Sequence, residues 1–364
     1  MAIPNIVHVV GARPNFMKAA PVIRALQAFP VSQRLIHTGQ HYDPELSDVF
    51  FEQLRLPAPD ANLAVGSGSH AAQTAALMLA IEHEFLRFDP TAVAAYGDVN
   101  STMAAALVAA KLGIAVAHVE SGLRSFDTQM PEEINRRVTD LLADWLFVTA
   151  PEGLENLRAE GVPDSRLWYV GNPMIDSLVT VLPGIDDEVG GRPFAAEPYA
   201  VATVHRPSNV DDPDAARSVA LMLQATAALL QVVIPLHPRG RSTLMAAGLR
   251  PSARLRIVTP LGYREFIALV RRAAVVVTDS GGLQEETTFL GTPCLTIRTT
   301  TERPCTITHG TNRLVSPEEV PAAVARILAG GRPATRALPP LWDGQAGTRI
   351  ASILADLVGG HSGL

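Results

Sequence analysis

The stretch of residues 273–304 constrains the fold of this chain more than any other part of the sequence. In order, it shows the signals of a buried strand, a small polar turn, a helix and a second apolar strand: Ala274–Val277, Thr278–Gly282, a helix opening with Gln284 and stopping at Gly291, and Cys294–Ile297. This order is typical of half of a nucleotide-binding fold. The glycines and the free N–H groups of the helix start favour an anion site, although a tight turn beside a capped helix is the simpler interpretation.

The same alternation of short apolar strands and helical patterns runs through the rest of the chain. The predicted strands are Ile6–Val10, Leu35–Thr38, Ala92–Tyr96, Ala115–Val119, Leu146–Thr149, Leu167–Val170, Tyr199–Val204, Val232–Leu236 and Ile257–Thr259. Helices between successive strands imply parallel, doubly wound sheets. The predicted class is therefore α/β, with two Rossmann-like doubly wound parallel-sheet domains facing each other across a cleft.

The domain limits follow from composition. Residues 183–198 are rich in Pro, Gly and acidic residues and show weak periodicity, which indicates a link. We expect an N-terminal domain over residues 1–175 and a C-terminal domain over residues 198–340. A last helical pattern, residues 345–360, is expected to pack back on the N-terminal domain.

The composition excludes several classes of protein. The net charge is −6 and no run of Lys or Arg occurs, which argues against a surface for duplex nucleic acid. The sequence shows no signal peptide and no membrane-spanning segment, so we expect a soluble, cytoplasmic protein. Cys294 and Cys305 are the only cysteines, and the ten histidines show no metal-ligand spacing. We expect no metal site.

Polar residues follow many of the predicted strands, and such positions share one edge of a parallel sheet, where ligands bind. They are Arg13, His41, Asp98 and Glu120 in the first half and His205, His237, Ser280 and Arg298 in the second. Any one of them alone is more simply a cap or turn residue. Arg13 and Lys18, at a helix start, could bind a diphosphate or a carboxylate, or could simply be solvated. Glu132 either points toward the same edge or only pairs with Arg136.

Other nucleotide and hydrolase motifs are weak or missing. Residues 66–71 fit G-x-G-x-x-A, but their apolar lead-in is short and follows Pro57 and Pro59, so a loop is the better interpretation. The sequence contains no G-x-S-x-G elbow, no Walker loop and no H-E-x-x-H motif.

Taken together, a series of short motifs resembles one family. The motifs are Gly11-Ala12-Arg13-Pro14, Thr38-Gly39-Gln40-His41, Tyr96-Gly97-Asp98, His118 to Arg124, Pro131 to Arg136, His205-Arg206, Asp279 to Glu286 and Thr301-Glu302-Arg303-Pro304. In this order, over nearly the whole chain, they resemble the non-hydrolysing UDP-N-acetylglucosamine 2-epimerases. The resemblance implies a glycosyltransferase-B type fold that closes over a UDP-sugar, a homodimer, no cofactor, and a role in cell-surface polysaccharide biosynthesis.

The resemblance also implies a reaction and the residues that serve it. UDP-N-acetylglucosamine would be epimerised at C2 to UDP-N-acetylmannosamine, by elimination and re-addition of UDP through a 2-acetamidoglucal. The implied catalytic residues are Asp98, Glu120, Glu132 and His205. The implied substrate-binding residues are Arg13, Lys18, Arg136, Ser280, Gly281, Gly282, Glu286 and Arg303. Which carboxylate removes the C2 proton stays open.

This chain departs from the family pattern at a possible regulatory site. Many relatives read His-Arg-x-Glu-Asn where it has Ser208, and that Glu, with residues matching Gln40, His41 and His237, helps to hold an activating second substrate. We therefore expect weak or absent substrate activation. Alternative functions are a C2 epimerase of a related sugar such as UDP-2,3-diacetamido-glucuronate, a hydrolysing epimerase, a glycosyltransferase, and a non-catalytic UDP-sugar-binding protein.

Overall fold

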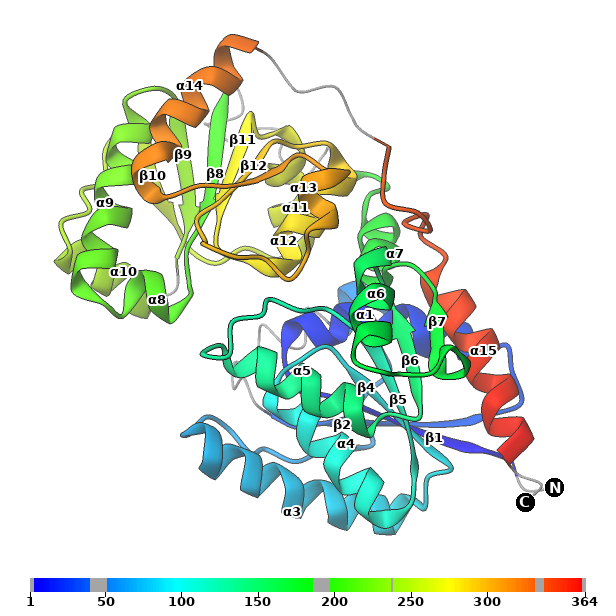
Figure 1. Cartoon of the computed structure of the whole chain (residues 1–364). Coiled ribbons are helices and arrows are strands. Elements are labelled where there is room, and N and C mark those ends of the chain that lie inside the picture. The colour runs from blue at the N-terminus through cyan, green and yellow to red at the C-terminus, as the bar shows by residue number, and fades with distance from the viewer. Residues whose placement is uncertain (1–2, 40–50, 186–196, 237, 331–336, 362–364) are drawn as a thin grey trace. The chain divides into compact units, whose positions relative to one another are not determined.

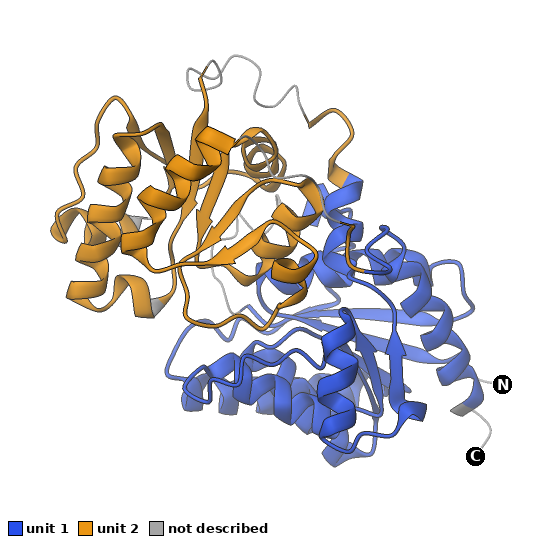
Figure 2. Ribbon diagram, turned by 45° about the horizontal axis from the view of Figure 1, so that its top comes forward, with its two compact units in different colours: residues 1–180, 340–364 blue, residues 181–339 orange. Residues whose placement is uncertain are grey.

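The computed structural model describes residues 3–39, 51–185, 197–236, 238–330 and 337–361. The chain forms two compact units (Figure 2). Unit 1 comprises residues 1–180 and 340–364, and unit 2 comprises residues 181–339. Each unit is described by itself below.

Unit 1 is built on a seven-stranded parallel sheet with the order β3-β2-β1-β4-β5-β6-β7. Its strands are β1 (Asn5–Val10), β2 (Ser32–His37), β3 (Ala61–Asn62), β4 (Ala92–Tyr96), β5 (Ala115–Ser121), β6 (Trp145–Val148) and β7 (Leu167–Tyr169). Its helices are α1 (Arg13–Leu26), α3 (His70–Phe88), α4 (Asn100–Leu112), α5 (Pro131–Leu142), α6 (Pro151–Ala159), α7 (Pro173–Val181) and α15 (Ala346–His361). Helices α3 and α4 cover one face of the sheet, and α1 and α15 lie on the other (Figure 1).

Unit 2 repeats this plan with six parallel strands in the order β10-β9-β8-β11-β12-β13. They are β8 (Tyr199–Thr203), β9 (Gln231–Pro235), β10 (Leu255–Val258), β11 (Val275–Thr278), β12 (Cys294–Thr296) and β13 (Asn312–Leu314). Helices α9 (Pro213–Ala227), α10 (Pro238–Ala246) and α14 (Val320–Gly330) cover one face. The short α8 (Pro207–Val210) precedes α9, and the other face carries α11 (Tyr263–Arg272), α12 (Gly281–Leu290) and α13 (Cys305–Thr308) (Figure 1).

The central strands are short apolar runs because helices cover both of their faces. All residues of β4 and β11 are buried. Such runs, without polar alternation, are characteristic of parallel sheets. The predicted α/β class with two parallel sheets is thereby confirmed.

The C-terminal helix α15 belongs to unit 1, although it follows unit 2 in the sequence. It packs on α1 so closely that a Cβ atom at Gly347 would lie 2.7 Å from the backbone of Pro21. The Asp176 carboxylate accepts hydrogen bonds from the N–H groups of Ala346 (3.1 Å) and Gly347 (2.7 Å), at the start of the helix. Just before the helix, the Trp342 indole donates to the Thr149 carbonyl at 2.9 Å.

Two local predictions were wrong in ways that matter for the site. The strand expected to end at Val119 continues to Ser121, so Glu120 lies within β5 rather than after it. The helix expected to open with Gln284 begins at Gly281, with Ser280 as its N-cap, so the two glycines form its first turn. The sequence signals did not predict the short strands β3 and β13.

The described residues carry neither a membrane span nor a metal-binding cluster. None of their helices combines the length and the apolar character that a membrane crossing requires. The same residues contain no group of three or more His, Cys, Asp or Glu side chains that could hold a metal ion.

Candidate active site

The turn after β4 carries Asp98, and a buried arginine on α5, Arg136, fixes its side chain. Asp98 accepts hydrogen bonds through Oδ2 from Arg136, from Nη2 at 2.5 Å and from Nε at 3.2 Å. Arg136 lies on α5, is 2% exposed and also donates to Glu133 Oε2 at 2.6 Å. The Asn135 amide donates to the backbone carbonyl of Asp98 at 2.9 Å. The Asp98 carboxylate is thus an ionised group whose direction is set by α5.

Glu120 occupies a strained position near the end of β5. Its φ is +76°, a region that non-glycine residues seldom adopt, and the pairing of β5 with β6 shifts register between Val119 and Ser121. The Glu120 carboxylate lies 2.6 Å from Lys18 Nζ, and both side chains are buried. Backbone strain of this kind is concentrated at functional sites and costs about 1–3 kcal/mol. The strained backbone and the ion pair with Lys18 together fix the Glu120 carboxylate. Its strand, β5, pairs with β4, the strand that precedes Asp98.

Gly97 brings the two acids together, because it leaves room for Lys18. A Cβ atom at Gly97 would lie 2.6 Å from Lys18 Nζ, and the φ of +67° also favours glycine. The Gly97 N–H donates to the Val119 carbonyl at 2.9 Å. The Asn15 amide donates to the Tyr96 carbonyl at 2.6 Å, so α1 and β5 both hold the turn that presents Asp98.

The remaining predicted residues of unit 1 lie nearby on α1 and α5. Arg13 is exposed at the first position of α1, whereas Lys18 lies in the second turn and is buried, not solvated. Glu132 is half-buried in the first turn of α5. The adjacent Glu133 accepts hydrogen bonds from Ser125 N and Oγ, both at 2.8 Å, and so links Arg136 to the loop between β5 and α5.

In unit 2, Asp279 holds His205. Asp279 is fully buried, and its Oδ1 lies 2.9 Å from His205 Nδ1. It also accepts hydrogen bonds from the N–H groups of His205 (3.0 Å) and Arg206 (2.9 Å) and from the Asn209 amide (3.0 Å). Burial alone would raise the pKa of Asp279, but His205, Asn209 and Arg206 lower it to about 2. This arrangement requires a proton on His205 Nδ1 and leaves Nε2 for a ligand.

The first turn of α12 packs against a cluster of charged groups. A Cβ atom at Gly281 would lie 2.6 Å from both Arg303 Nη1 and Glu302 Oε1. Arg303 pairs with Glu302 and, through Nε at 3.0 Å, with Glu285. Because the first N–H groups of a helix have no carbonyl partner within the helix, this turn offers donors to an anion beside a guanidinium.

Glu286 is held by a tyrosine. The Tyr263 hydroxyl donates to Glu286 Oε1 at 2.9 Å, and both side chains are buried. Tyr263 begins α11, so two neighbouring helices fix this carboxylate.

Some predicted residues lie outside the described part of the chain, namely Gln40, His41 and His237.

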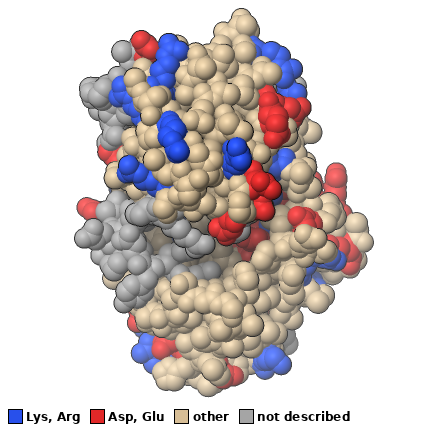
Figure 3. Space-filling model, turned by 90° about the vertical axis from the view of Figure 1, so that its left-hand side faces the viewer, with Lys and Arg blue, Asp and Glu red and all other residues tan. Residues whose placement is uncertain are grey.

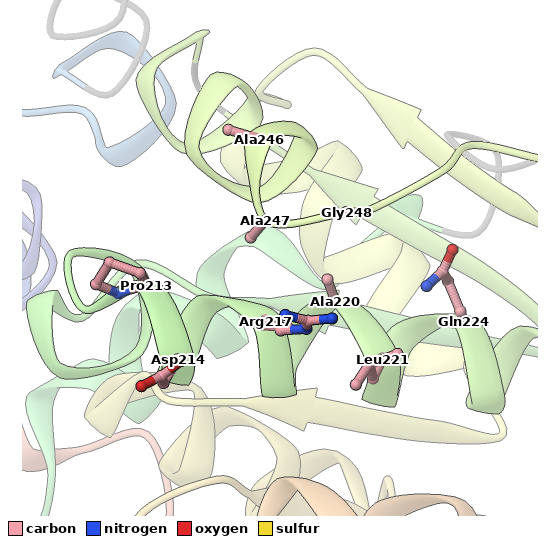
Figure 4. Close-up of a pocket in the computed structure, with 9 residues that line it drawn as sticks. All are labelled: Pro213, Asp214, Arg217, Ala220, Leu221, Gln224, Ala246, Ala247 and Gly248. Carbon is pink, nitrogen blue, oxygen red and sulfur yellow. The ribbon is translucent and has the colours of Figure 1, made fainter.

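A hollow of about 550 Å³ lies between α9 and α10, lined by residues such as Arg217, Gln224 and Ala247 (Figure 4). None of its nine lining residues is a predicted site residue. On the face shown in Figure 3, Lys and Arg are interspersed with Asp, Glu and neutral residues. The described residues of that face form no continuous basic surface.

Sequence reasoning missed several residues that hold the site together. Asn15, Glu133, Tyr263 and Asp279 each contact or orient a predicted site residue or its turn. Asp279 directly follows a strand, which could have singled it out. Asn15 and Tyr263 gave no comparable signal, because their partners lie on other elements, whereas Glu133 is three residues from Arg136 on the same helix and helical spacing could have indicated that pair.

The fold, together with the charged residues at the carboxyl edge of each sheet, defines the class of protein. Each unit is a parallel α/β sheet with charged residues after the carboxyl ends of its strands, and unit 2 adds a glycine-containing helix start beside a buried arginine. This is the arrangement of a two-domain enzyme that binds a nucleotide or another phosphorylated ligand.

Comparisons identify the family within that class. The family model described as UDP-N-acetylglucosamine 2-epimerase matches residues 24–355. The UDP-N-acetylglucosamine 2-epimerase of Methanocaldococcus jannaschii is 37% identical over 95% of this chain and 97% of its own length. The UDP-2,3-diacetamido-2,3-dideoxy-D-glucuronate 2-epimerase of Pseudomonas aeruginosa is 38% identical over 97% of this chain and 100% of its own.

A solved structure of a family member matches the fold of this chain. The crystal structure of the M. jannaschii enzyme in complex with UDP-GlcNAc and UDP matches with a TM-score of 0.88 and 36% identity, covering 97% of this chain and 99% of that chain. The protein belongs to the UDP-N-acetylglucosamine 2-epimerase family. The predicted family and enzyme class are confirmed.

Proposed function

We propose that this protein inverts C2 of UDP-N-acetylglucosamine and so interconverts it with UDP-N-acetylmannosamine. Beside family membership, one observation carries the proposal. Asp98 and Glu120 lie at the ends of the paired strands β4 and β5, and each is fixed by a buried cation. Two oriented carboxyl groups at one edge of the sheet suit a reaction that must take a proton from one face of a carbon and return one to the other.

The reaction divides into two halves. In the first, the C1–O bond to UDP breaks and a carboxylate takes the C2 proton, which leaves the C1=C2 double bond of 2-acetamidoglucal. In the second, an acid delivers a proton to the opposite face of C2, and a diphosphate oxygen of UDP forms the new bond to C1. Asp98, Glu120 and Glu132 divide the roles of base, acid and oxocarbenium stabiliser, because groups in different environments can hold different protonation states.

Unit 2 would hold the nucleotide. Arg303 and the N–H groups of Gly281 and Gly282 would stabilise the departing diphosphate, next to Ser280, whose own N–H donates to Thr278 Oγ1 at 2.9 Å. A His205 ring that carries a proton on Nε2 as well as on Nδ1 would add a further donor. Glu286, oriented by Tyr263, would accept hydrogen bonds from the ribose hydroxyls.

Three cations of unit 1, Arg13, Lys18 and Arg136, would have different roles. Arg13 is exposed at the start of α1 and would bind the diphosphate. Lys18 and Arg136 are buried in ion pairs, so they would act first on the acids that they hold.

A related UDP-sugar is the second candidate substrate, because the P. aeruginosa relative named for UDP-2,3-diacetamido-2,3-dideoxy-D-glucuronate matches along its entire length. Incubation with each UDP-sugar in D2O, followed by NMR, separates the candidates. Solvent deuterium at C2 of an epimerised UDP-GlcNAc supports the proposal. Free N-acetylmannosamine indicates a hydrolysing epimerase. If deuterium enters C2 only with UDP-2,3-diacetamido-glucuronate, that sugar is the substrate instead of UDP-N-acetylglucosamine.

The residue assignments have their own test. Asp98→Asn and Glu120→Gln should each lower turnover by about 10³-fold or more while UDP still binds. Asp60→Asn is the matched control, because Asp60 forms a half-exposed ion pair with Arg34 away from these acids. A variant of Asp98 or Glu120 with near-normal turnover would lose its place in the mechanism.

We also propose that the protein works as a homodimer. Helix α3 carries Leu79 and Leu86, which are 72% and 68% exposed, and exposed apolar side chains of this kind favour association. Sedimentation equilibrium at micromolar concentration tests the dimer. A cytoplasmic location stays a prediction from the sequence, and a role in cell-surface polysaccharide biosynthesis stays a prediction from the family resemblance.

Substrate activation should be weak, because Ser208 replaces a carboxylate acceptor. Ser208 is exposed on α8. We expect a hyperbolic dependence of rate on UDP-N-acetylglucosamine, whereas a strongly sigmoidal curve would contradict this.

A further inference from the structure

A buried histidine lies behind the two catalytic acids, next to the turn that carries Asp98. His118 is on β5, is fully buried, and its ring lies between α5 and the turn after β4. Its Nδ1 is 2.6 Å from Asp140 Oδ1, and its Nε2 is 2.8 Å from the carbonyl oxygen of Gly97. A carbonyl oxygen can only accept a hydrogen bond, and so can an ionised carboxylate.

Asp140 is ionised, so it cannot supply a proton to the ring. Its Oδ2 accepts hydrogen bonds from Arg124 Nη1 at 2.7 Å and from the Gly122 N–H at 3.1 Å. Burial alone would raise the pKa of Asp140, but His118 and Arg124 offset this and lower it. Both ring nitrogens of His118 therefore face acceptors, and a neutral imidazole carries only one N–H.

We infer that His118 is held as a doubly protonated imidazolium and that it is a positioning residue, which fixes the peptide between Gly97 and Asp98 for the epimerase reaction. The inference deepens the proposed function and rests on it. The Gly97 carbonyl belongs to the peptide group that leads into Asp98, so the Nε2–H bond restrains that peptide from β5. On the other side of Gly97, its N–H is bonded to the Val119 carbonyl at 2.9 Å.

The charges around the ring fit a cation. Asp140 of α5 faces Nδ1, with Arg124 behind it, and Arg124 in turn pairs with Glu160 of the loop after α6 at 2.7 Å. Beyond Gly97 lies the ion pair of Lys18 and Glu120. Each cation in this series therefore lies next to an acid. A neutral His118 has one N–H and would leave either Asp140 Oδ1 or the Gly97 carbonyl without a donor. With the proton on Nδ1, the turn that carries Asp98 would lose its restraint from β5.

The same unit contains a matched histidine that should be neutral. His8 on β1 is also fully buried, with Nδ1 2.7 Å from the Tyr96 hydroxyl and Nε2 3.1 Å from Gln33 Oε1. A hydroxyl can donate to one nitrogen while the amide oxygen accepts from the other, so a single ring proton satisfies both contacts. Burial lowers the pKa of His8 to about 4.

The protonation state is tested by ¹⁵N NMR of the full chain labelled at its histidines, with His118→Gln and His8→Gln to assign the signals. At pH 7.5 we expect both ring nitrogens of His118 to show protonated shifts, and His8 to show one protonated and one bare nitrogen. A bare nitrogen on His118 overturns the inference. This measurement needs no activity, so it holds even if UDP-N-acetylglucosamine proves not to be the substrate.

The positioning role is tested by kinetics. His118→Ala should lower kcat by about 10²-fold with KM and UDP affinity unchanged, because displaced catalytic groups cost rates of that order. His118→Gln, whose amide can still donate to the Gly97 carbonyl, should recover about tenfold of that loss, and His8→Gln should change kcat less than about threefold. A kcat for His118→Ala within threefold of the wild type, or a parallel loss of UDP affinity, overturns the positioning role.

Discussion

Units 1 and 2 offer different functional groups to a ligand, carboxylates in unit 1 and a histidine in unit 2, yet each unit fixes its groups with buried charged partners. In unit 1 the presented groups are the acids Asp98 and Glu120, and the anchors are Arg136 and Lys18. In unit 2 the presented His205 is anchored by Asp279. A buried ion is tolerated only when it is paired and hydrogen-bonded, so each buried partner is tied to the group that it contacts and fixes the direction of that group.

The units differ in how the backbone contributes. Unit 1 places Glu120 at a φ of +76°, and the Lys18 ion pair holds that strained conformation in place. In unit 2 the anion-facing element is the first turn of a regular helix. This difference suits the proposed division of labour, because proton transfer needs carboxylates held in one direction, whereas a diphosphate is held by charge and several N–H donors.

Removal of the Lys18 anchor should have the largest effect. Lys18→Met leaves Glu120 buried without its cation, so the free energy of unfolding should fall by about 3–5 kcal/mol. Arg34→Met is the control: the Arg34–Asp60 pair is half-exposed, and its loss should cost less than about 1 kcal/mol. Urea denaturation followed by circular dichroism measures both.

A double variant separates the ion pair from the cavity. Lys18→Met with Glu120→Gln removes both charges and should recover a large part of the lost stability, while turnover stays abolished. If the double variant is no more stable than Lys18→Met alone, the loss arises from packing and not from an uncompensated charge.

Asp279→Asn removes the corresponding buried charge in unit 2, the partner of His205. The pKa of Asp279 is about 2 in the folded protein and lies below its ordinary value, so its stabilisation is complete above about pH 4 and is lost as the pH falls toward 2. The free energy of unfolding of the wild type should fall by about 2 kcal/mol over this window. Acid denaturation should show that Asp279→Asn lacks this component and that its turnover is lower. An unchanged acid profile would mean that His205 and the loop do not depend on the charge.

Asp176 of unit 1 should respond to pH in the opposite direction. Burial is the main cause that raises its pKa to about 6, against the lowering effect of the N–H groups of Gly347 and Ala346. Since the folded pKa lies above the ordinary value, the stabilisation exists below about pH 4 and is lost as the pH rises through 6. Hydrogen exchange of α15 should become faster over this range, by an amount equivalent to about 2 kcal/mol or less. In Asp176→Asn the exchange rate should lose this pH dependence, once the intrinsic rate is corrected for.

The fold could be predicted from the sequence because its signals are local. Short apolar strands, helical patterns between them and polar residues just after the strands follow from periodicity alone, and the two sheets agree with them. The same rule assigned Asp98 and Glu120 to one rim from the strand pattern, and β4 and β5 are indeed neighbours in a parallel sheet.

The pairing of charges could not be predicted in this way. Helical spacing suggested a pair between Glu132 and Arg136, but Arg136 pairs with Glu133 and with Asp98, the latter 38 residues earlier in the chain. The conformation of Glu120 likewise depends on Lys18, which is 102 residues away. The contacts of Arg136 with Asp98 and of Lys18 with Glu120 depend on the packing of elements far apart in sequence, and no periodic pattern reveals them.

Gly281→Ala should have the smallest effect and should confine it to nucleotide binding. The added methyl group would meet Arg303 Nη1 and Glu302 Oε1 at 2.6 Å, but these are the ends of flexible side chains that can move aside. We expect UDP affinity, measured by calorimetry, to fall by about 3–10-fold, which is less than about 1.4 kcal/mol, with turnover at saturation nearly unchanged. Gly97→Ala is the matched change in unit 1, where Lys18 Nζ lies 2.6 Å from the new methyl group at a φ of +67°. It should lower turnover and spare UDP affinity. If instead Gly281→Ala slows turnover and Gly97→Ala weakens UDP binding, the division of labour between the two units is reversed.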